Sequence, residues 1–336
     1  MKIRPLALGL PAAAAAAVVA VVAVVALVAV LVSRPGGVPA DGAGLRIVVS
    51  IPPLAELATR LAPPGSSVTV LMPPGRSEHG HEFTPGDLAH LARADVVVYV
   101  GLGLEPQVEK FLAQRPDKRR RDVCFATAVG ILPTDHNHNH HNHDHDHDHD
   151  HDHEGCDHGG VDPHLWLDPI LIRRLVPVLS GAVGAALKTS GRDTPEAIGA
   201  LIQAEEDLDR DIAALDDEFR SALEPLRGIP IVTHHNAWGR LADRYGLRIA
   251  AVIRPIETAE PTPGQVAQAV KAIREQGATT IFVEPQFDAA SARRIAASAG
   301  ASVGILDPIG DGRWFDLMRT NLTSLLGASR ENAAKQ

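Results

Sequence analysis

Short apolar runs alternate with helix-like segments in the first half of the chain. The segment "IPPLAELATRLA" has a helical pattern, and a second helix is expected after Thr84, with Pro85 at its first position and Asp87 as its third residue. Strands that alternate with helices are typical of a parallel sheet covered by helices. The runs that predict strands are 45–50, 66–72, 95–100 and 121–128.

The second half repeats this alternation without an obvious repeat of sequence. The segments between its apolar runs have helical patterns, and one of them begins at Thr262-Pro263. We therefore expect a second parallel-sheet α/β lobe. The runs that predict its strands are 229–233, 248–253, 279–284 and 302–307.

The longest helical pattern covers residues 194–226, between the two series. A helix of that length is about 45 Å long, which suits a rigid connection between two lobes better than a place inside one. The predicted fold is α/β, with lobes at 45–190 and 228–330 joined by a long spine helix within 191–227. Its apolar residues recur at helical spacing: Ile198, Leu201, Leu208, Ile212, Leu215, Phe219 and Leu223.

The N-terminus has the pattern of an export signal. Lys2 and Arg4 precede an uncharged run of 28 residues from Pro5 to Val32, which is long enough to span a bilayer. Val38-Pro39-Ala40 resembles a small-residue cleavage site, although it stands well beyond the run. Residues 1–44 are thus interpreted as a signal peptide or an N-terminal membrane anchor with a linker. Both place the body outside the cytoplasm.

Residues 135–158 form a low-complexity tract that holds eleven of the 17 histidines. It also contributes −8 to the formal net charge of −9, so the acidity is local, and no basic concentration suggests nucleic acid. Alternating Asp and His cannot bury a core, and we expect a disordered, metal-attracting loop. In an oxidising compartment a disulfide between Cys124 and Cys156 would close its base. The alternatives are two unpaired thiols, or Cys156 as a soft metal ligand.

Outside the tract only six histidines remain: His79, His81, His90, His164, His234 and His235. His235 and Asp307 directly follow predicted strands, where ligands gather in parallel α/β folds. Imidazoles with one carboxylate suit zinc, whereas additional carboxylate oxygens favour manganese or iron. The spacing matches no zinc-finger or zinc-protease motif, so position alone does not select the ligands.

Six stretches resemble the solute-binding proteins of zinc and manganese ABC importers (cluster A-I), in particular the zinc-uptake ZnuA-like branch. They occur in the order of that family and cover residues 45 to 327. The resemblance implies two lobes, a spine helix and a metal site in the cleft between the lobes. The stretches are "PPGRSEHGHEFTPGDLAHLARADVVVYVGLGLE", "VDPHLWLDP", "HHNAWGRLADRYGL", "AEPTP", "VEPQF" and "ILDPIG".

Carried over by motif position, the resemblance implies His79, His164 and His235 as metal ligands. Asp307 is the expected fourth ligand, and Glu78, directly before His79, is the alternative. The "NAWG" that follows His235 departs from the family, which usually has Asp-Ala-Phe. The tract lies between the first two ligand motifs, as in zinc-specific members.

The remaining conspicuous residues receive other roles. His81 is expected at the rim, His234 turned away from its neighbour, and His90 on a surface. Glu284 is expected beside the ligands without binding the metal, and Trp166 and Trp238 as walls of the site.

The predicted function is capture of Zn²⁺ outside the cytoplasm and its delivery to an ABC permease in the membrane, by a monomer that is not an enzyme. Mn²⁺ is the alternative cargo. A zinc hydrolase would need a general base and an open coordination position, and a metal buffer or adhesin would act through the tract. Because the imidazoles must lose protons to bind zinc, affinity is expected to fall below about pH 6.5.

Overall fold

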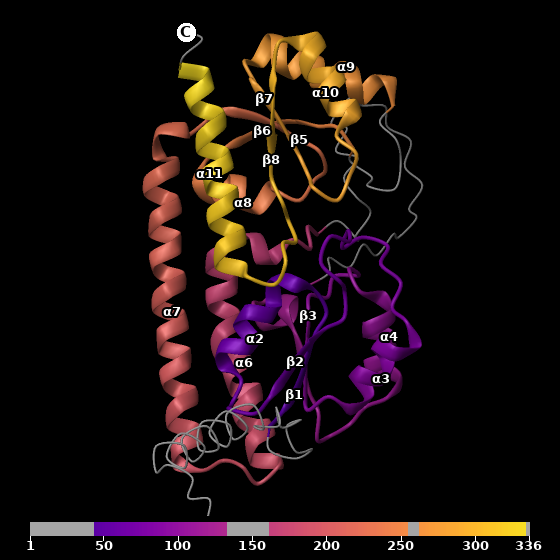
Figure 1. The fold of residues 1–336 in the computed structure, drawn as a ribbon, viewed down its shortest axis with the longest axis vertical. Helices are drawn as coiled ribbons and strands as arrows, with labels where there is room; N and C mark the ends of the chain where they lie inside the picture. Colours follow the sequence, from indigo (N-terminus) through magenta and orange to yellow (C-terminus); the bar gives the residue numbers. More distant parts are fainter. Residues whose placement is uncertain (1–43, 133–160, 255–261, 334–336) are drawn as a thin grey trace, which may run out of the picture. The chain divides into compact units, whose positions relative to one another are not determined.

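The first lobe is built on a four-stranded sheet. The computed structural model describes residues 44–132, 161–254 and 262–333 (Figure 1). The strands lie in the order β2-β1-β3-β4, and every neighbouring pair is parallel, as predicted. The central strands are lined with buried valines, which suits a sheet covered on both faces. Their bounds are β1 (Arg46–Val49), β2 (Ser67–Val70), β3 (Val96–Tyr99) and β4 (Arg121–Cys124).

The strand predicted over 121–128 is wrong in its second half. Strand β4 ends at Cys124, and Phe125–Ala128 form the short helix α5. Because β4 is an edge strand, its partner in the sheet is β3, which ends at Tyr99 opposite Cys124. Beyond Cys124 the pairing ends with one hydrogen bond, from Ala126 N to Val100 O at 3.0 Å, and Phe125 turns into the core.

The helices of the first lobe begin where their capping residues predict. Thr84 and Asp87 form a capping box at the start of α3, and the Asp168 side chain accepts from Ile170 N at the start of α6. Helix α6 is apolar and long enough to cross a membrane, but it packs against α7 and the sheet as a core helix. The bounds are η1 (Pro52–Leu54), α2 (Ala55–Leu61), α3 (Pro85–Arg93), α4 (Pro106–Gln114), η2 (Leu165–Leu167) and α6 (Pro169–Thr189).

The second lobe has the same sheet order, β6-β5-β7-β8, and is again parallel throughout. All four strands fall within the predicted runs. Its elements are β5 (Pro230–Thr233), α8 (Gly239–Tyr245), β6 (Arg248–Val252), α9 (Pro263–Gln276), β7 (Thr280–Val283), α10 (Ala290–Ala299), β8 (Ser302–Ile305) and α11 (Trp314–Ala333).

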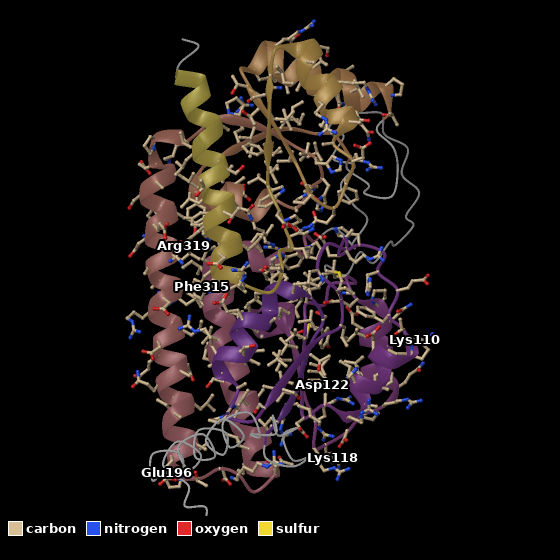
Figure 2. All side chains as sticks on the ribbon, viewed as in Figure 1. Lys110, Lys118, Asp122, Glu196, Phe315 and Arg319 are labelled. Carbon is tan, nitrogen blue, oxygen red and sulfur yellow. The ribbon has the colours of Figure 1, made fainter. Side chains whose placement is uncertain are left out.

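Helix α7 (Pro195–Leu223) is the predicted long helix and is followed by η3 (Glu224–Leu226). It contacts α2 and α6 of the first lobe and α8 and α11 of the second. Arg319 of α11 forms an ion pair with Glu218 of α7 at 3.1 Å, and Figure 2 shows Arg319 beside Phe315 on α11. The predicted apolar face is buried at Leu201, Leu208, Ile212, Leu215, Phe219 and Leu223.

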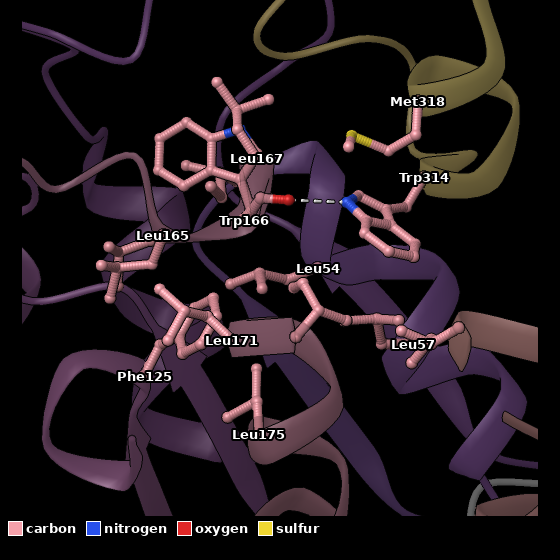
Figure 3. Packing of buried hydrophobic residues seen from close by; sticks show 14 of the residues in the cluster. Leu54, Leu57, Phe125, Leu165, Trp166, Leu167, Leu171, Leu175, Trp314 and Met318 are labelled. Carbon is pink, nitrogen blue, oxygen red and sulfur yellow. Dashed lines mark hydrogen bonds between the residues drawn. The ribbon is translucent and has the colours of Figure 1, made fainter. Parts of the chain in front are cut away.

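One hydrophobic core extends from the first sheet through α6 and α7 to α11. Trp314 Nε1 donates to the main-chain oxygen of Trp166 at 2.9 Å (Figure 3). Trp166 Nε1 in turn donates to the main-chain oxygen of Pro308 at 2.6 Å. The lobes are therefore joined by shared packing as well as by α7, which restricts any relative movement. The predicted leader, the histidine-rich tract and Cys156 lie outside the described residues, so the predictions made for them stay predictions.

Candidate metal centre

The first candidate ligands lie in the loop between β2 and α3. Gly75 and Gly80 adopt positive φ values of 76° and 72° in this loop, which a residue with a side chain rarely adopts. The turn buries Glu78, of which 3% is exposed, and leaves His79 half-buried. His79 N donates to Ser77 Oγ at 3.1 Å, which helps to hold the loop.

The third candidate, His164, lies directly before η2 and is only 1% exposed. Asp162 binds it twice through the same oxygen. Oδ1 accepts from His164 N at 2.9 Å and lies 2.7 Å from His164 Nδ1. The loop thereby fixes both the backbone and the ring of His164.

The fourth candidate, His235, follows β5 at its carboxyl end and is fully buried. Its Nδ1 lies 2.6 Å from Glu284 Oε1, and Glu284 follows β7, the neighbouring strand. Carboxyl ends of parallel strands share one edge of the sheet, which brings these side chains together. Glu284 thus has the expected place beside a candidate ligand.

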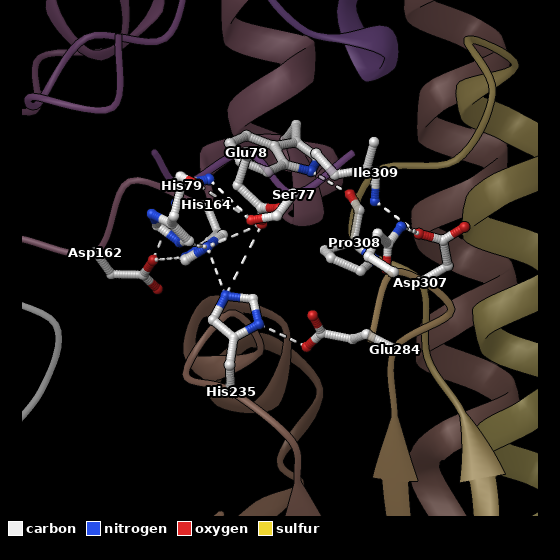
Figure 4. A network of polar contacts seen from close by, with 12 residues as sticks. Ser77, Glu78, His79, Asp162, His164, His235, Glu284, Asp307, Pro308 and Ile309 are labelled. Atoms are coloured by element: carbon white, nitrogen blue, oxygen red, sulfur yellow. Dashed lines mark hydrogen bonds and ion pairs between the residues drawn. The ribbon is translucent and has the colours of Figure 1, made fainter. Parts of the chain in front are cut away.

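The candidate atoms from these three segments converge, and one atom from each of Glu78, His79, His164 and His235 lies within 4.8 Å of every other (Figure 4). His164 Nε2 is 3.2 Å from both His79 Nε2 and His235 Nε2. Glu78 Oε1 is 3.4 Å from His164 Nε2 and 3.9 Å from His235 Nε2. Zn–N bonds of 2.0–2.1 Å place tetrahedral ligands about 3.3–3.4 Å apart. The group therefore has the dimensions of a zinc site.

The tautomers also suit a metal. A neutral imidazole has one N–H and one lone pair. When Nδ1–H of His164 and of His235 donates to its carboxylate, both Nε2 lone pairs face each other over 3.2 Å. That arrangement is favourable only with a proton or a cation between the two nitrogens. Carboxylates in these positions orient imidazoles and raise their basicity toward metals.

The charges within the group reinforce one another. Burial disfavours a charged His164, but the Asp162 and Glu78 carboxylates outweigh it and raise its pKa to about 10. Burial also opposes the charge of Glu78, yet the surrounding imidazoles lower its pKa to about 2. The pKa of His235 is raised against its burial by Glu284. Without metal, the site thus holds protons that a divalent cation would displace.

Asp307 does not join this group, although it was the expected fourth ligand. Its Oδ1 accepts from Gln286 Nε2 at 2.7 Å and from the amides of Ile309 and Gly310 at 3.0 and 3.1 Å. Figure 4 shows Asp307 apart from the imidazoles. These hydrogen bonds commit the carboxylate to the turn after β8, and the alternative, Glu78, lies among the imidazoles instead.

Among the described residues, the three remaining histidines lie outside the group. His90 is exposed on α3, as expected, and His81 packs against Phe83. His234 packs against Phe287, and its burial lowers its pKa to about 4. Trp166 lies against His164, with ring centroids 5.3 Å apart, as expected of a wall. Trp238 is buried in the hydrophobic core at the start of α8.

Sequence analysis missed two residues, Asp162 and Arg240. Asp162 stands two positions before His164 in "VDPH", and this spacing was a usable signal because a side chain reaches a backbone amide two residues on. Arg240 of α8 donates to Asp162 O at 2.6 and 3.1 Å from Nη2 and Nε. Nothing in the local pattern links residues this far apart.

Comparison with known proteins finds relatives along most of the chain. The family profile described as "Zinc-uptake complex component A periplasmic" matches residues 47–328. The high-affinity zinc uptake system protein ZnuA of Yersinia pestis is 24% identical over 282 residues, which is 82% of this chain and 86% of that protein. The manganese-binding lipoprotein MntA of Halalkalibacterium halodurans is 23% identical over 304 residues, or 86% of this chain and 90% of that protein. A crystal structure of ZnuA superposes with a TM-score of 0.68 at 25% identity, over 85% of this chain and 99% of that one.

Proposed function

The chain belongs to the zinc-uptake complex component A family, and from this we propose that it captures Zn²⁺ outside the cytoplasm and delivers it to the permease of an ABC importer. In this role zinc is the cargo and not a resident cofactor. The permease would receive the ion from the loaded protein, with the energy supplied by a separate ATPase.

The observation that carries the proposal is the cluster of Glu78, His79, His164 and His235. We assign these four as the zinc ligands, with Glu78 in place of Asp307. Three nitrogens and one oxygen suit a borderline cation at tetrahedral geometry. Since Glu78 is buried among imidazoles that lower its pKa to about 2, it is ionised and ready to bind.

Zinc is favoured over manganese by the same donor set. Mn²⁺ prefers carboxylate, carbonyl and water oxygens in an octahedral shell, whereas this group offers one carboxylate against three imidazoles. The sequence supports the same choice, because the eleven histidines of the tract favour a metal that binds imidazole well. The kinship with the manganese-binding lipoprotein keeps Mn²⁺ as the competing cargo.

A carrier explains the site better than an enzyme does. Catalytic zinc keeps three protein ligands and an open position for water, whereas these four candidates complete a tetrahedron. Glu284 Oε1 lies 2.6 Å from His235 Nδ1, the position of a carboxylate that orients a ligand. We therefore assign no catalytic residue.

The surrounding segments receive their roles from sequence. We propose that residues 1–44 export the chain or anchor it at the membrane, and that residues 135–158 collect zinc near the tight site. We also expect the carrier to act as a monomer, since one chain supplies all four ligands.

Metal competition on the purified full chain tests the proposal. Zinc and manganese are each titrated against a chromophoric chelator at equal free concentrations. We expect one tight zinc site, together with weaker zinc sites from the tract, and weaker binding of manganese. Tighter binding of manganese would reassign the cargo, and the absence of any tight site would refute the proposal.

A further inference from the structure

The loop that carries His164 is held by a helix of the other lobe. Helix α8 begins four residues after His235 and places Arg240 against Asp162. Both Nη2 and Nε of Arg240 donate to the main-chain oxygen of Asp162, at 2.6 and 3.1 Å. Arg240 Nε also lies 3.7 Å from Asp162 Oδ2, which adds an ionic contact to the hydrogen bonds.

Asp162, which Arg240 holds, in turn contacts the candidate ligand His164. While Arg240 holds its main chain and attracts Oδ2, its other oxygen, Oδ1, binds the amide and Nδ1 of His164. A donor on α8, a bridging carboxylate and an imidazole thus form one continuous set of contacts. The side chain of Arg240 is largely covered, with 21% exposed, so solvent screens the arrangement only partly.

We propose that Arg240 is a positioning residue for the metal site, acting through Asp162 on the orientation and tautomer of His164. This inference rests on the proposed function, because it specifies how that site acquires its geometry. Arg240 does not touch the metal. It determines where the Nε2 lone pair of His164 points and links that direction to the lobe that supplies His235.

Charge supports the same role. A zinc ion among Glu78, Asp162 and Glu284 meets three negative charges, and the guanidinium of Arg240 brings the loaded cluster to neutrality. Buried charges are tolerated when they are paired and hydrogen-bonded. Arg240 therefore supplies the positive partner of Asp162, with its Nε 3.7 Å from Oδ2.

The same helix offers a matched control. One turn further on, Arg244 of α8 holds Asp168, the N-cap of α6, with its Nη2 2.6 Å from Oδ2. This pair also joins the two lobes, but its hydrogen bonds serve the N-terminus of α6. A purely structural contribution of α8 would respond to the loss of either arginine, whereas positioning of His164 would respond to Arg240 alone.

The experiment compares Arg240→Ala, Asp162→Ala, Asp162→Asn and Arg244→Ala in the full chain. Zinc affinity is measured by chelator competition, the visible spectrum of bound Co²⁺ reports the ligand geometry, and thermal unfolding without metal reports stability. We expect Asp162→Ala to weaken zinc binding by about 10–100-fold and Arg240→Ala by about 3–10-fold, each with an altered Co²⁺ spectrum. Asp162→Asn keeps an acceptor for Nδ1–H and should recover much of the affinity.

Two further results decide between the explanations. Arg244→Ala should lower the unfolding temperature and leave affinity and spectrum unchanged, and adding Arg240→Ala to Asp162→Ala should weaken binding little further. Unchanged affinity and spectrum in Arg240→Ala, or an equal loss of affinity in Arg244→Ala, would overturn the inference. Failure of the unsubstituted protein to bind zinc would instead refute the proposed function.

Discussion

His164 and His235 face each other with their Nε2 atoms 3.2 Å apart, although 71 positions separate them in the chain. Each ring is held from behind by a carboxylate, Asp162 for His164 and Glu284 for His235. Both Nε2 lone pairs then point at the space between the two rings. This orientation indicates a cation site, which the presence of two histidines alone does not. The predictions below follow from this geometry.

Removal of one central imidazole should abolish tight binding. His164 Nε2 lies at 3.2 Å from two other candidate nitrogens, so His164→Ala deletes the ligand that the others surround. Isothermal titration with zinc should then lack its tight phase and retain the weak phases of the tract. His90→Ala on the exposed face of α3 is the control and should titrate as the unsubstituted protein does.

Deletion of residues 136–153 should remove weak zinc binding and leave tight binding intact. It removes ten of the 17 histidines but none of the four clustered candidates. We expect one tight zinc site to survive and the weak sites to disappear, as measured by bound zinc per chain after dialysis and by titration. A deletion variant without the tight site would place zinc capture in the tract itself.

Substitutions of Glu78 and Asp307 should show which of these two carboxylates binds zinc. Glu78→Gln removes the charge that lies 3.4 Å from His164 Nε2 and should weaken zinc binding at least tenfold. Asp307→Asn should change affinity less than threefold and thermal stability only slightly, because an asparagine Oδ1 still accepts the hydrogen bonds of the turn after β8. The reverse ranking of the two affinities would restore Asp307 as the ligand.

Zinc affinity should rise with pH well above the range expected from free histidine. In the metal-free protein the pKa of His164 is raised from 6.5 to about 10, so a proton stabilises the folded state below pH 6.5 and this contribution is lost as pH rises through about 10. Zinc must displace that proton, and the raised pKa of His235 adds a second competitor. Between pH 6.5 and 9 we expect the logarithm of the affinity to rise by about one to two units per pH unit.

The measurement is chelator competition at several pH values, together with proton release on zinc addition in weak buffer. Glu78 should not contribute in this range, because its pKa is lowered to about 2. An affinity that is constant above pH 6.5, without proton release, would show that the imidazoles are already neutral and would contradict this account.

Local signals in the sequence determined much of the fold. The strand pattern of both lobes, the capping of α3 and α6 and the buried face of α7 follow from periodicity and from residues within a few positions of one another. The misassigned end of the strand at 121–128 marks the limit of such signals. Whether an apolar run continues as a strand depends on the length of its neighbour in space, here β3.

The candidate site, like the fold, was predicted from the sequence only in part. The sequence, through its resemblance to the family, indicated histidines 79, 164 and 235 as candidate ligands and zinc as the favoured cargo. Only the tertiary structure decided that Glu78 joins them while Asp307 is bound within its own turn, and that Arg240 of one lobe holds Asp162 of the other. The physical reason is that a metal site depends on distances and on directions of lone pairs between segments brought together by packing. No local pattern of residues records those distances.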